Sequence, residues 1–352
     1  VHGRDMEGTA SIFRANVLDS ASNRLNENYI RDTVFFDEGD NNPQEAEAYG
    51  GQLRLELDFE NGTTLTSITG VETVENRSKG DIDGGNMVTG PGFIPFPSVT
   101  EDGLTNLEQF TQELRLSGEN ADGMFWQGGL FYFNSDFTVD TNPFFVPSSQ
   151  VQHQNEAWAL FGQLSLPLND KLTLTGGLRY TDDKKDARAF NAPGGPIAPV
   201  TVKGEQTSFD VSLMWDVSEG LNLYGRVANG FRAPSIQGRD VAFFGGMTSA
   251  RAETIISSEV GFKINGADGR VLLNGAFFHS TIDDTQLTAI GGASTLAQLL
   301  TAEKGEGTGM DVDASFLITE NVTVTAGLSF VETEIKDDTI TVTPCPFGGC
   351  TV

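Results

Sequence analysis

Hydrophobic and polar positions alternate with a period of two over long stretches of this chain. In residues 171–185, KLTLTGGLRYTDDKK, the positions Leu172, Leu174, Leu178 and Tyr180 are separated by polar residues or glycine. Such alternation predicts β-strands with one apolar and one polar face. The pattern recurs in YGGQLRLELDF, EAWALFGQLSLPL, SFDVSLMWDV and NVTVTAGLSF, whereas TTLTSITGVETV and MFWQGGLFYF alternate too irregularly for us to assign their faces. The sequence therefore predicts an all-β protein.

Connections of two lengths separate these strands. Short polar turns are expected at Asn61-Gly62, ENADG at 119–123, Asn169-Asp170, SEG at 218–220, NGADG at 265–269 and TEN at 319–321. Longer Gly-, Pro- and Asp-rich loops are expected at about 78–105, 138–154, 185–204, 233–253 and 285–305. Short turns at one end and long loops at the other are typical of outer-membrane barrels. We count twelve antiparallel strands over residues 47–335, after a polar lead-in at 1–46 that we expect to be an extracellular loop.

The apolar face of these strands could meet either a protein core or lipid. Strands of soluble sandwiches or propellers typically have about 5 to 6 residues, whereas membrane-spanning strands need about 9 to 11. The strands here have the longer length, and aromatic residues lie near their ends on the apolar face, at Tyr49, Trp158, Tyr180, Trp215 and Phe231. We therefore predict the wall of an antiparallel transmembrane β-barrel, with the Leu172 face in lipid.

The opposite face carries charged residues at mid-strand. The lumen-facing candidates are Glu113, Arg115, Arg179, Arg226, Arg232, Glu259 and Lys263. They could contact a solute, or they could form internal ion pairs or hold another domain in the lumen. We favour the structural role for most of them, since charges facing a lumen are common in barrels.

Composition limits the remaining classes of function. The 352 residues have a formal net charge of -27 and a pI of about 4.3, which argues against nucleic-acid binding. Mean hydropathy is -0.21, and no apolar run approaches the roughly 18 residues of a spanning helix. The first residues, VHGRDMEGTASIF, do not form a signal peptide. The chain is then either cytoplasmic or a mature or internal piece of an exported protein.

Few residues suggest chemistry. We expect residues 336–352 to be a truncated loop carrying Cys345 and Cys350, which in an exported protein form a local disulfide and otherwise remain two free thiols. His279 and Ser280 are adjacent on a strand and so point to opposite faces, which excludes them as a catalytic pair. No metal-ligand or phosphate-binding spacing is present. We therefore predict no catalytic residue, cofactor or metal site, and a protein that is not an enzyme.

Several phrases of the sequence resemble one family. They are TLTSITG followed by GDIDGG, FTQELRLSG leading into WQGGLFYF, FGQLSLPLNDKLTLTGGLRYTDDKK, LYGRVANGFRAPSI, SSEVGFKINGADGRVLLNGAFFHSTIDDTQL and GTGMDVDASF. In this order and spacing they resemble the barrel domain of TonB-dependent outer-membrane receptors. The resemblance implies a 22-stranded barrel filled by an N-terminal plug domain and energised by the inner-membrane TonB complex. We expect the plug and closing strands to be absent from this chain, and the twelve strands to form an open wall.

The function implied by this resemblance is uptake of a scarce solute across the bacterial outer membrane. A complete small pore, an outer-membrane hydrolase and a surface adhesin remain alternatives. The expected partners are outer-membrane lipid, the plug, TonB and a small-molecule ligand. Loop tips in GPGFIPFPSVTEDG and TNPFFVPSSQ present aromatic residues that could stack on a solute. The sequence does not distinguish a siderophore from a carbohydrate or a vitamin.

Overall fold

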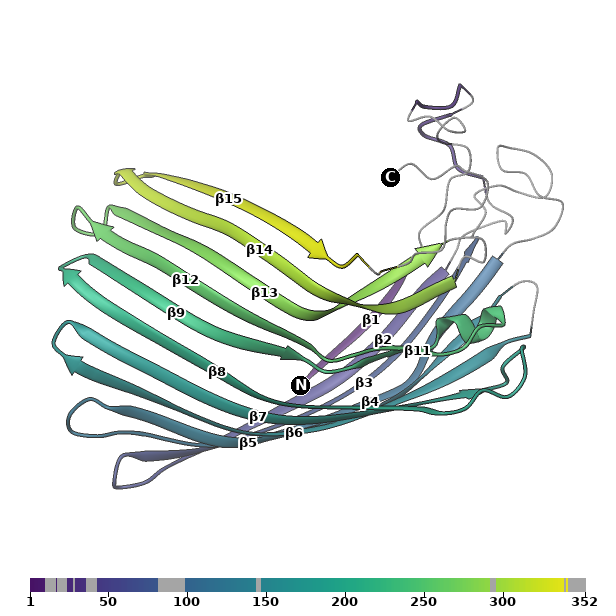
Figure 1. The fold of residues 1–352 in the computed structure, drawn as a ribbon, viewed down its shortest axis with the longest axis horizontal. Coiled ribbons are helices and arrows are strands. Elements are labelled where there is room, and N and C mark those ends of the chain that lie inside the picture. The colour runs from purple at the N-terminus through teal and green to yellow at the C-terminus, as the bar shows by residue number, and fades with distance from the viewer. Residues whose placement is uncertain are drawn as a thin grey trace.

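The chain folds into one large curved antiparallel sheet (Figure 1). This computed structural model describes residues 1–9, 17, 24–27, 29–35, 43–81, 99–143, 147–291, 296–338 and 340. Sequential strands pair with one another around the curve, so the sheet is a meander. This confirms the predicted all-β, antiparallel barrel wall.

Within the described residues, thirteen strands form the main sheet, and a two-stranded hairpin forms a second, small sheet. The main strands are β1 (His2–Thr9), β2 (Pro43–Asp58), β3 (Thr63–Asp81), β4 (Val99–Glu119), β5 (Phe125–Asn142), β6 (Ser149–Asn169), β7 (Leu172–Phe190), β8 (Val200–Ser218), β9 (Leu221–Arg232), β12 (Glu253–Gly266), β13 (Val271–Gly291), β14 (Leu296–Thr319) and β15 (Val322–Lys336). The hairpin consists of β10 (Ser235–Gln237) and β11 (Thr248–Ala250), joined through the short 3-10 helix η1 (Arg239–Phe243).

All six predicted short turns join consecutive strands, and they lie at one end of the sheet. Their geometry explains the glycines in them. Gly62 and Gly220 have φ values of 77° and 83°, a left-handed conformation that glycine adopts without steric cost. At Gly220 a Cβ atom would lie 2.2 Å from the backbone oxygen of Asn265, so the next turn also excludes a side chain there. The turn residues therefore fix the strand pairing.

Two differences from the predicted boundaries concern strand ends. The predicted lead-in at 1–46 is not all loop, because β1 lies within it and pairs with β2, which begins at Pro43. Its sequence, HGRDMEGT, is exposed throughout and has no alternation that could reveal a strand. The other strands also continue into the predicted long loops, as β7 does as far as Phe190. These extensions make the strands longer than a bilayer requires, so the alternation that faces lipid ends before the strand does.

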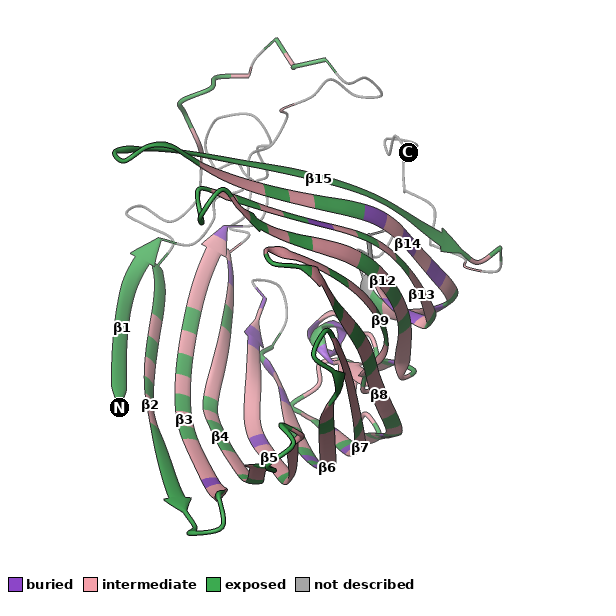
Figure 2. Cartoon of the chain, turned by 90° about the vertical axis from the view of Figure 1, so that its left-hand side faces the viewer, coloured by how far each residue is buried: buried purple, intermediate pink, exposed green. Residues whose placement is uncertain are grey.

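The two faces of the sheet differ as predicted. Leu160, Leu178, Val260 and Phe277 share one face and are exposed, with exposed fractions of 54 to 62%. The opposite face carries Val151 and Ala187, which pack with Val241 of η1 in a small buried core. Figure 2 shows η1 inside the curve of the sheet, so the face that packs against it is the inner, concave face.

Four aromatic residues expected at the lipid boundary lie on the outer face, namely Tyr49, Trp158, Tyr180 and Trp215. Tyr49, Trp158 and Trp215 are exposed there, and the rings of Trp158 and Tyr180 contact each other across β6 and β7 with centroids 5.3 Å apart. Aromatic residues with a polar tip are enriched at membrane boundaries, since their rings enter the lipid while the tips reach water. The outer face therefore has the pattern of a lipid-facing surface.

The sheet is open in the part of the chain that the structure describes. β1 pairs with β2 and β15 pairs with β14, and these two outermost strands do not pair with each other. The open wall that we predicted is thus confirmed for these residues. Unpaired backbone groups cannot persist in hydrocarbon, so both edges require partner strands in a membrane.

Candidate functional site: the inner face and mouth of the sheet

The seven charged candidates lie on the inner face, by the alternation of their strands. The residues are Glu113 and Arg115 of β4, Arg179 of β7, Arg226 and Arg232 of β9, and Glu259 and Lys263 of β12. They do not form one cluster. The structure separates them into an ion-paired group on β8, β9 and β12, an arginine among aromatic rings on β5–β7, and a pair on β4.

The first group centres on Arg226. Its guanidinium donates to the Asp210 carboxylate of β8, with Nε 3.0 Å from Oδ2. On β12, Glu259 accepts a hydrogen bond of 2.6 Å from the Tyr224 hydroxyl, and Lys263 lies 5.9 Å from the centroid of the same ring. Two basic and two acidic side chains therefore balance one another across three strands, as expected for internal ion pairing.

Arg179 has a different environment. Its guanidinium carbon lies 5.4 Å from the centroid of Phe131 and 5.8 Å from that of Phe161, and its Nε donates to the Thr181 hydroxyl at 3.1 Å. Contact with aromatic faces stabilises a guanidinium, which is planar and weakly hydrated. The irregular alternation of MFWQGGLFYF thus has a structural explanation, because Phe131 is an inner-face residue that packs on this arginine.

The remaining candidates make simpler arrangements. Glu113 and Arg115 are two residues apart on β4 and pair at 3.5 Å. Arg232 is exposed at the last position of β9, where its register partner is Glu253 of β12. These residues lie at different heights of the inner face, so the structure provides no common pocket for all seven predicted residues.

The mouth of the sheet is crossed by the segment between β9 and β12, residues 233–252, which we call the crossbar loop. It contains β10, η1 and β11 and folds over the inner face rather than away from it (Figures 1 and 2). The loop contacts β5, β6 and β7 on one side of the curve and β14 on the other. Two contacts hold the loop against β6 and β7. Val241 is buried there, and Lys185 of β7 donates from its Nζ to the Pro234 oxygen at 2.9 Å.

A single glutamine joins both ends of the crossbar loop. The side-chain nitrogen of Gln286, on β13, donates to the backbone oxygens of Ala233 and Arg251 at 2.9 and 2.8 Å. Its side-chain oxygen accepts a hydrogen bond of 2.7 Å from Ser235. Gln286 is buried, so these hydrogen bonds form away from water. They use both the amide nitrogen and the amide oxygen of the side chain.

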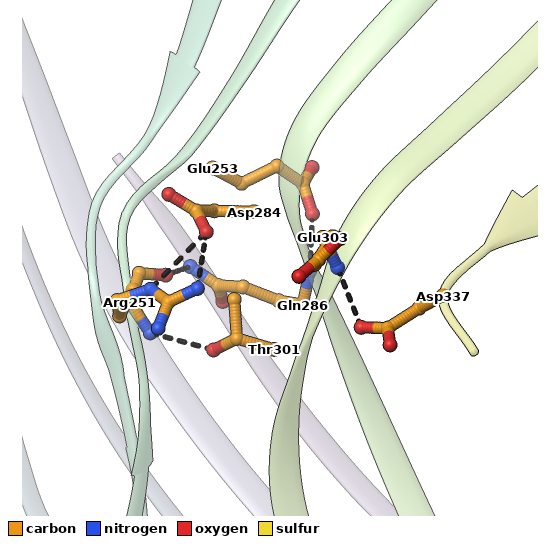
Figure 3. A network of polar contacts seen from close by, with 7 residues as sticks. All are labelled: Arg251, Glu253, Asp284, Gln286, Thr301, Glu303 and Asp337. Carbon is orange, nitrogen blue, oxygen red and sulfur yellow. Dashed lines mark hydrogen bonds and ion pairs between the residues drawn. The ribbon is translucent and has the colours of Figure 1, made fainter. Parts of the chain in front are cut away.

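The strands beside Gln286 are locally distorted, and polar side chains compensate for the distortion (Figure 3). Asp284 has a φ of 55° and, with Glu303 opposite, is left out of the β13–β14 ladder. The Arg251 guanidinium binds the Asp284 carboxylate, and the Glu303 amide donates to Asp337 at 2.8 Å. Arg251 also donates from its amide to the Thr301 hydroxyl at 3.0 Å. This network fixes the base of the crossbar loop on β13 and β14.

One carboxyl group at the mouth is affected by burial. Asp102 lies at the end of β4 away from the short turns, beyond the exposed apolar residues Phe110, Leu114 and Leu116 of that strand. Burial raises the pKa of Asp102, while a hydrogen bond from Thr141 and the positive charge of Arg239 in the crossbar loop act in the opposite direction. The crossbar loop is therefore electrostatically coupled to the far wall as well as packed against it.

The residues that build the mouth were not identified as candidates from the sequence. Gln286 stands in DDTQL with no motif, and its partners are more than thirty residues away along the chain. The sequence indicated a long connection at 233–253 but not its inward fold. The apolar run VAFF at 241–244 was one available signal, since it interrupts a segment rich in glycine and polar residues.

The other chemical predictions have different outcomes. Cys345 and Cys350 lie outside the described residues, so their disulfide stays a prediction. Among the residues that the structure describes, no group of three or more His, Cys, Asp and Glu side chains is arranged to hold a metal ion. A search of the same residues finds no helix with the length and apolar character needed to cross a bilayer.

The long strands, lipid-type outer face and ion-paired inner face together define the wall of an outer-membrane β-barrel. Residues 4–344 match the family model described as TonB dependent receptor-like, beta-barrel. This chain belongs to that family. Its members are bacterial outer-membrane proteins, which places the chain in the outer membrane and confirms the predicted location.

Several receptors are similar to the chain in structure or sequence. The ferric yersiniabactin uptake receptor FyuA from Yersinia pestis superposes with a TM-score of 0.67 at 18% identity, over 86% of this chain and 45% of the receptor. The copper transporter OprC superposes with a TM-score of 0.64 at 15% identity, over 83% and 47%. The pesticin receptor of Yersinia pestis is 26% identical over 198 residues, or 55% of this chain and 28% of the receptor. The chain spans about half the length of the solved structures that it matches.

Proposed function

We propose that this chain forms part of the barrel of a TonB-dependent receptor that takes up a scarce solute across the outer membrane. The observation that carries the proposal is the inner face, which is polar and ion-paired and lies beneath a folded loop at the mouth. Such a surface suits a lumen that holds a solute or another domain. The open sheet supports a role as one part of a larger barrel rather than as a complete small pore.

The charged inner residues have a structural role in this proposal. Asp210 neutralises Arg226, Tyr224 binds Glu259, and Arg179 lies near the rings of two phenylalanines. We propose that the TonB complex supplies the energy and that a plug domain contacts the inner face. The chain itself performs no chemical reaction in this account. A hydrolase would need a nucleophile beside a base, and the register leaves His279 and Ser280 on opposite faces of β13.

The solute that we propose is a metal ion carried by a chelator. The similar structures include a ferric yersiniabactin uptake receptor, a ferric-catecholate import receptor and a copper transporter. These names guide only the choice of first substrates. A carbohydrate or a vitamin would be tested next if metal chelates are not taken up.

Uptake by cells tests this proposal. The complete receptor that contains this chain would be expressed in a strain lacking its own receptors, and uptake of ⁵⁵Fe chelates or copper would be followed. A parallel strain without TonB is the matched control. We expect uptake that requires both the receptor and TonB. Uptake that continues undiminished without TonB would instead support the passive-pore alternative.

A further inference from the structure

A histidine of the wall lies directly beneath the crossbar loop. His153 is an inner-face residue of β6, its register partner on β7 is Ala187, and Val151 is the next inner-face residue along β6. Val241 of the crossbar loop packs against both Val151 and Ala187, which lie diagonally across this part of the sheet. A side chain that contacts both of these residues also lies beside His153. The imidazole is therefore part of the surface on which the loop rests.

The surroundings of this imidazole favour its neutral form. The ring of His153 stacks on that of Phe137 on β5, with centroids 5.1 Å apart and planes inclined by 15°. Within the described part of the chain, the ring makes no hydrogen bond or ion pair. His153 lies beyond Trp158 on β6, outside the lipid band, and burial lowers the pKa of its imidazole.

The charged groups around His153 are already paired with one another. Lys185 follows Ala187 on the inner face of β7, and its Nζ lies 2.9 Å from the Asp183 carboxylate. On η1, the Arg239 guanidinium lies 3.2 Å from the Asp240 carboxylate. A proton on His153 would thus add a third positive charge to a region where both nearby carboxylates have cationic partners. The other inner-face residues that β5, β6 and β8 place around it are uncharged, namely Ser135, Val139, Val151, Asn155, Val200 and Val202.

We propose that His153 makes the crossbar loop an acid-sensitive lid, which is closed while the imidazole is neutral and is released when the imidazole takes up a proton. With the loop open, water can solvate the charged ring, whereas the closed loop excludes that water. Phe137 attracts a charged ring as well, but both residues belong to the wall, so this attraction is the same in the two states.

The direction of the pH dependence follows from these two states. The neutral imidazole stabilises the closed loop fully above about pH 6.5, the ordinary pKa of histidine, and this stabilisation is lost as the pH falls below that value. The inference goes beyond the proposed uptake function, because the same device would act on the mouth whatever solute enters it.

Hydrogen exchange at two pH values tests the proposal. The complete receptor, purified from outer membranes, would be labelled at about pH 5.5 and at about pH 7.5, on either side of the ordinary pKa of histidine. Exchange of residues 234–250 would be corrected for the chemical rate at each pH. His153→Gln and His153→Phe both remove the titrating group, and the second keeps an aromatic ring against Phe137. His279→Gln removes a histidine from the outer face of β13 and is the matched control. Asp102 is present in every variant, so its titration cancels from the comparison.

In the parent protein we expect the protection of residues 234–250 to fall by roughly threefold to tenfold at the lower pH, since a pKa difference of one unit between the open and closed states is a factor of ten. His279→Gln should behave as the parent does. Protection in both His153 variants should no longer depend on pH over this range. A parent protein whose loop exchanges equally at the two pH values would overturn the proposal. The same pH dependence in the parent and in either folded His153 variant would also overturn it.

Discussion

The side-chain nitrogen of Gln286 on β13 donates to the backbone oxygen of Arg251, 2.8 Å away, at the point where the crossbar loop returns to the sheet. The same nitrogen also bonds the Ala233 oxygen, where the loop leaves β9. One buried amide therefore closes a loop that otherwise depends on contacts with the opposite wall.

Replacement of Gln286 by alanine should release this loop. The substitution removes the side-chain bonds to Ala233, Ser235 and Arg251 and leaves the partly buried backbone oxygens of Ala233 and Arg251 without this partner. Each such group costs about 1 to 3 kcal/mol, so we expect the crossbar loop to open locally before the sheet unfolds. Hydrogen exchange of residues 234–250 should accelerate by at least tenfold. Gln206→Ala, which removes a side-chain bond to the neighbouring Thr207 oxygen on β8, is the control and should leave this exchange unchanged.

Adjacent residues of β7 should respond oppositely to the same substitution. Leu174 pairs with Leu166 and Leu213 on the outer face, whereas Thr175 pairs with Ser165 on the inner face, with hydroxyl oxygens 3.0 Å apart. An arginine near the bilayer midplane costs roughly 2 to 4 kcal/mol. Leu174→Arg should therefore reduce the yield of folded, heat-modifiable barrel far more than Thr175→Arg does. Spin labels at the two positions provide a second measurement, and equal quenching by a lipid-soluble reagent would refute the assigned faces.

The strands and turns of the wall were predictable because each depends on residues that are close together in the sequence. A strand between two solvents must alternate, as Leu174 and Thr175 do, and a two-residue connection must turn at residues such as Gly220. β1 was missed because every residue of HGRDMEGT is exposed. Both faces of this strand meet the same environment, so its hydrophobic and polar residues do not alternate. The crossbar loop was seen only as a long connection. Its inward fold depends on Val241 meeting Val151 and on Gln286 meeting Arg251, contacts between distant segments that no short pattern records.

The turn between β8 and β9 should tolerate no side chain at Gly220. Its φ of 83° costs a non-glycine residue about 1 to 2 kcal/mol, and a Cβ atom would meet the Asn265 oxygen at 2.2 Å. Gly220→Ala should therefore lower the free energy of unfolding by more than 2 kcal/mol, since the clash adds to the backbone cost. Gly176→Ala, on the outer face of β7 with no atom within 4 Å of a new Cβ, should change it by well under 1 kcal/mol. Urea unfolding in lipid vesicles measures both.

The cysteine pair should be oxidised in the native membrane. A protein of the outer membrane meets an oxidising compartment, and Cys345 and Cys350 are separated by four residues containing Pro and two Gly, which suits a short disulfide loop. Alkylation without reductant should leave both residues unlabelled, and reduction should expose both. Mass spectrometry distinguishes the two states. Complete labelling before reduction would mean free thiols and would leave the fold of the wall unaffected.

Two arginines of the inner face should differ in their contribution to stability. Arg226 pairs with Asp210, but the two side chains are 49% and 45% exposed, and exposed ion pairs contribute only about 0 to 1 kcal/mol. Arg179 contacts the rings of Phe131 and Phe161 through its guanidinium, each contact contributing about 0.5 to 1 kcal/mol. Arg179→Ala should therefore destabilise the barrel more than Arg226→Ala. Raising the salt concentration should reduce the effect of Arg226→Ala and leave most of that of Arg179→Ala, because salt screens charge pairs and not ring packing. Unfolding midpoints at low and high salt decide this, and equal salt sensitivity of the two variants would contradict the packed role of Arg179.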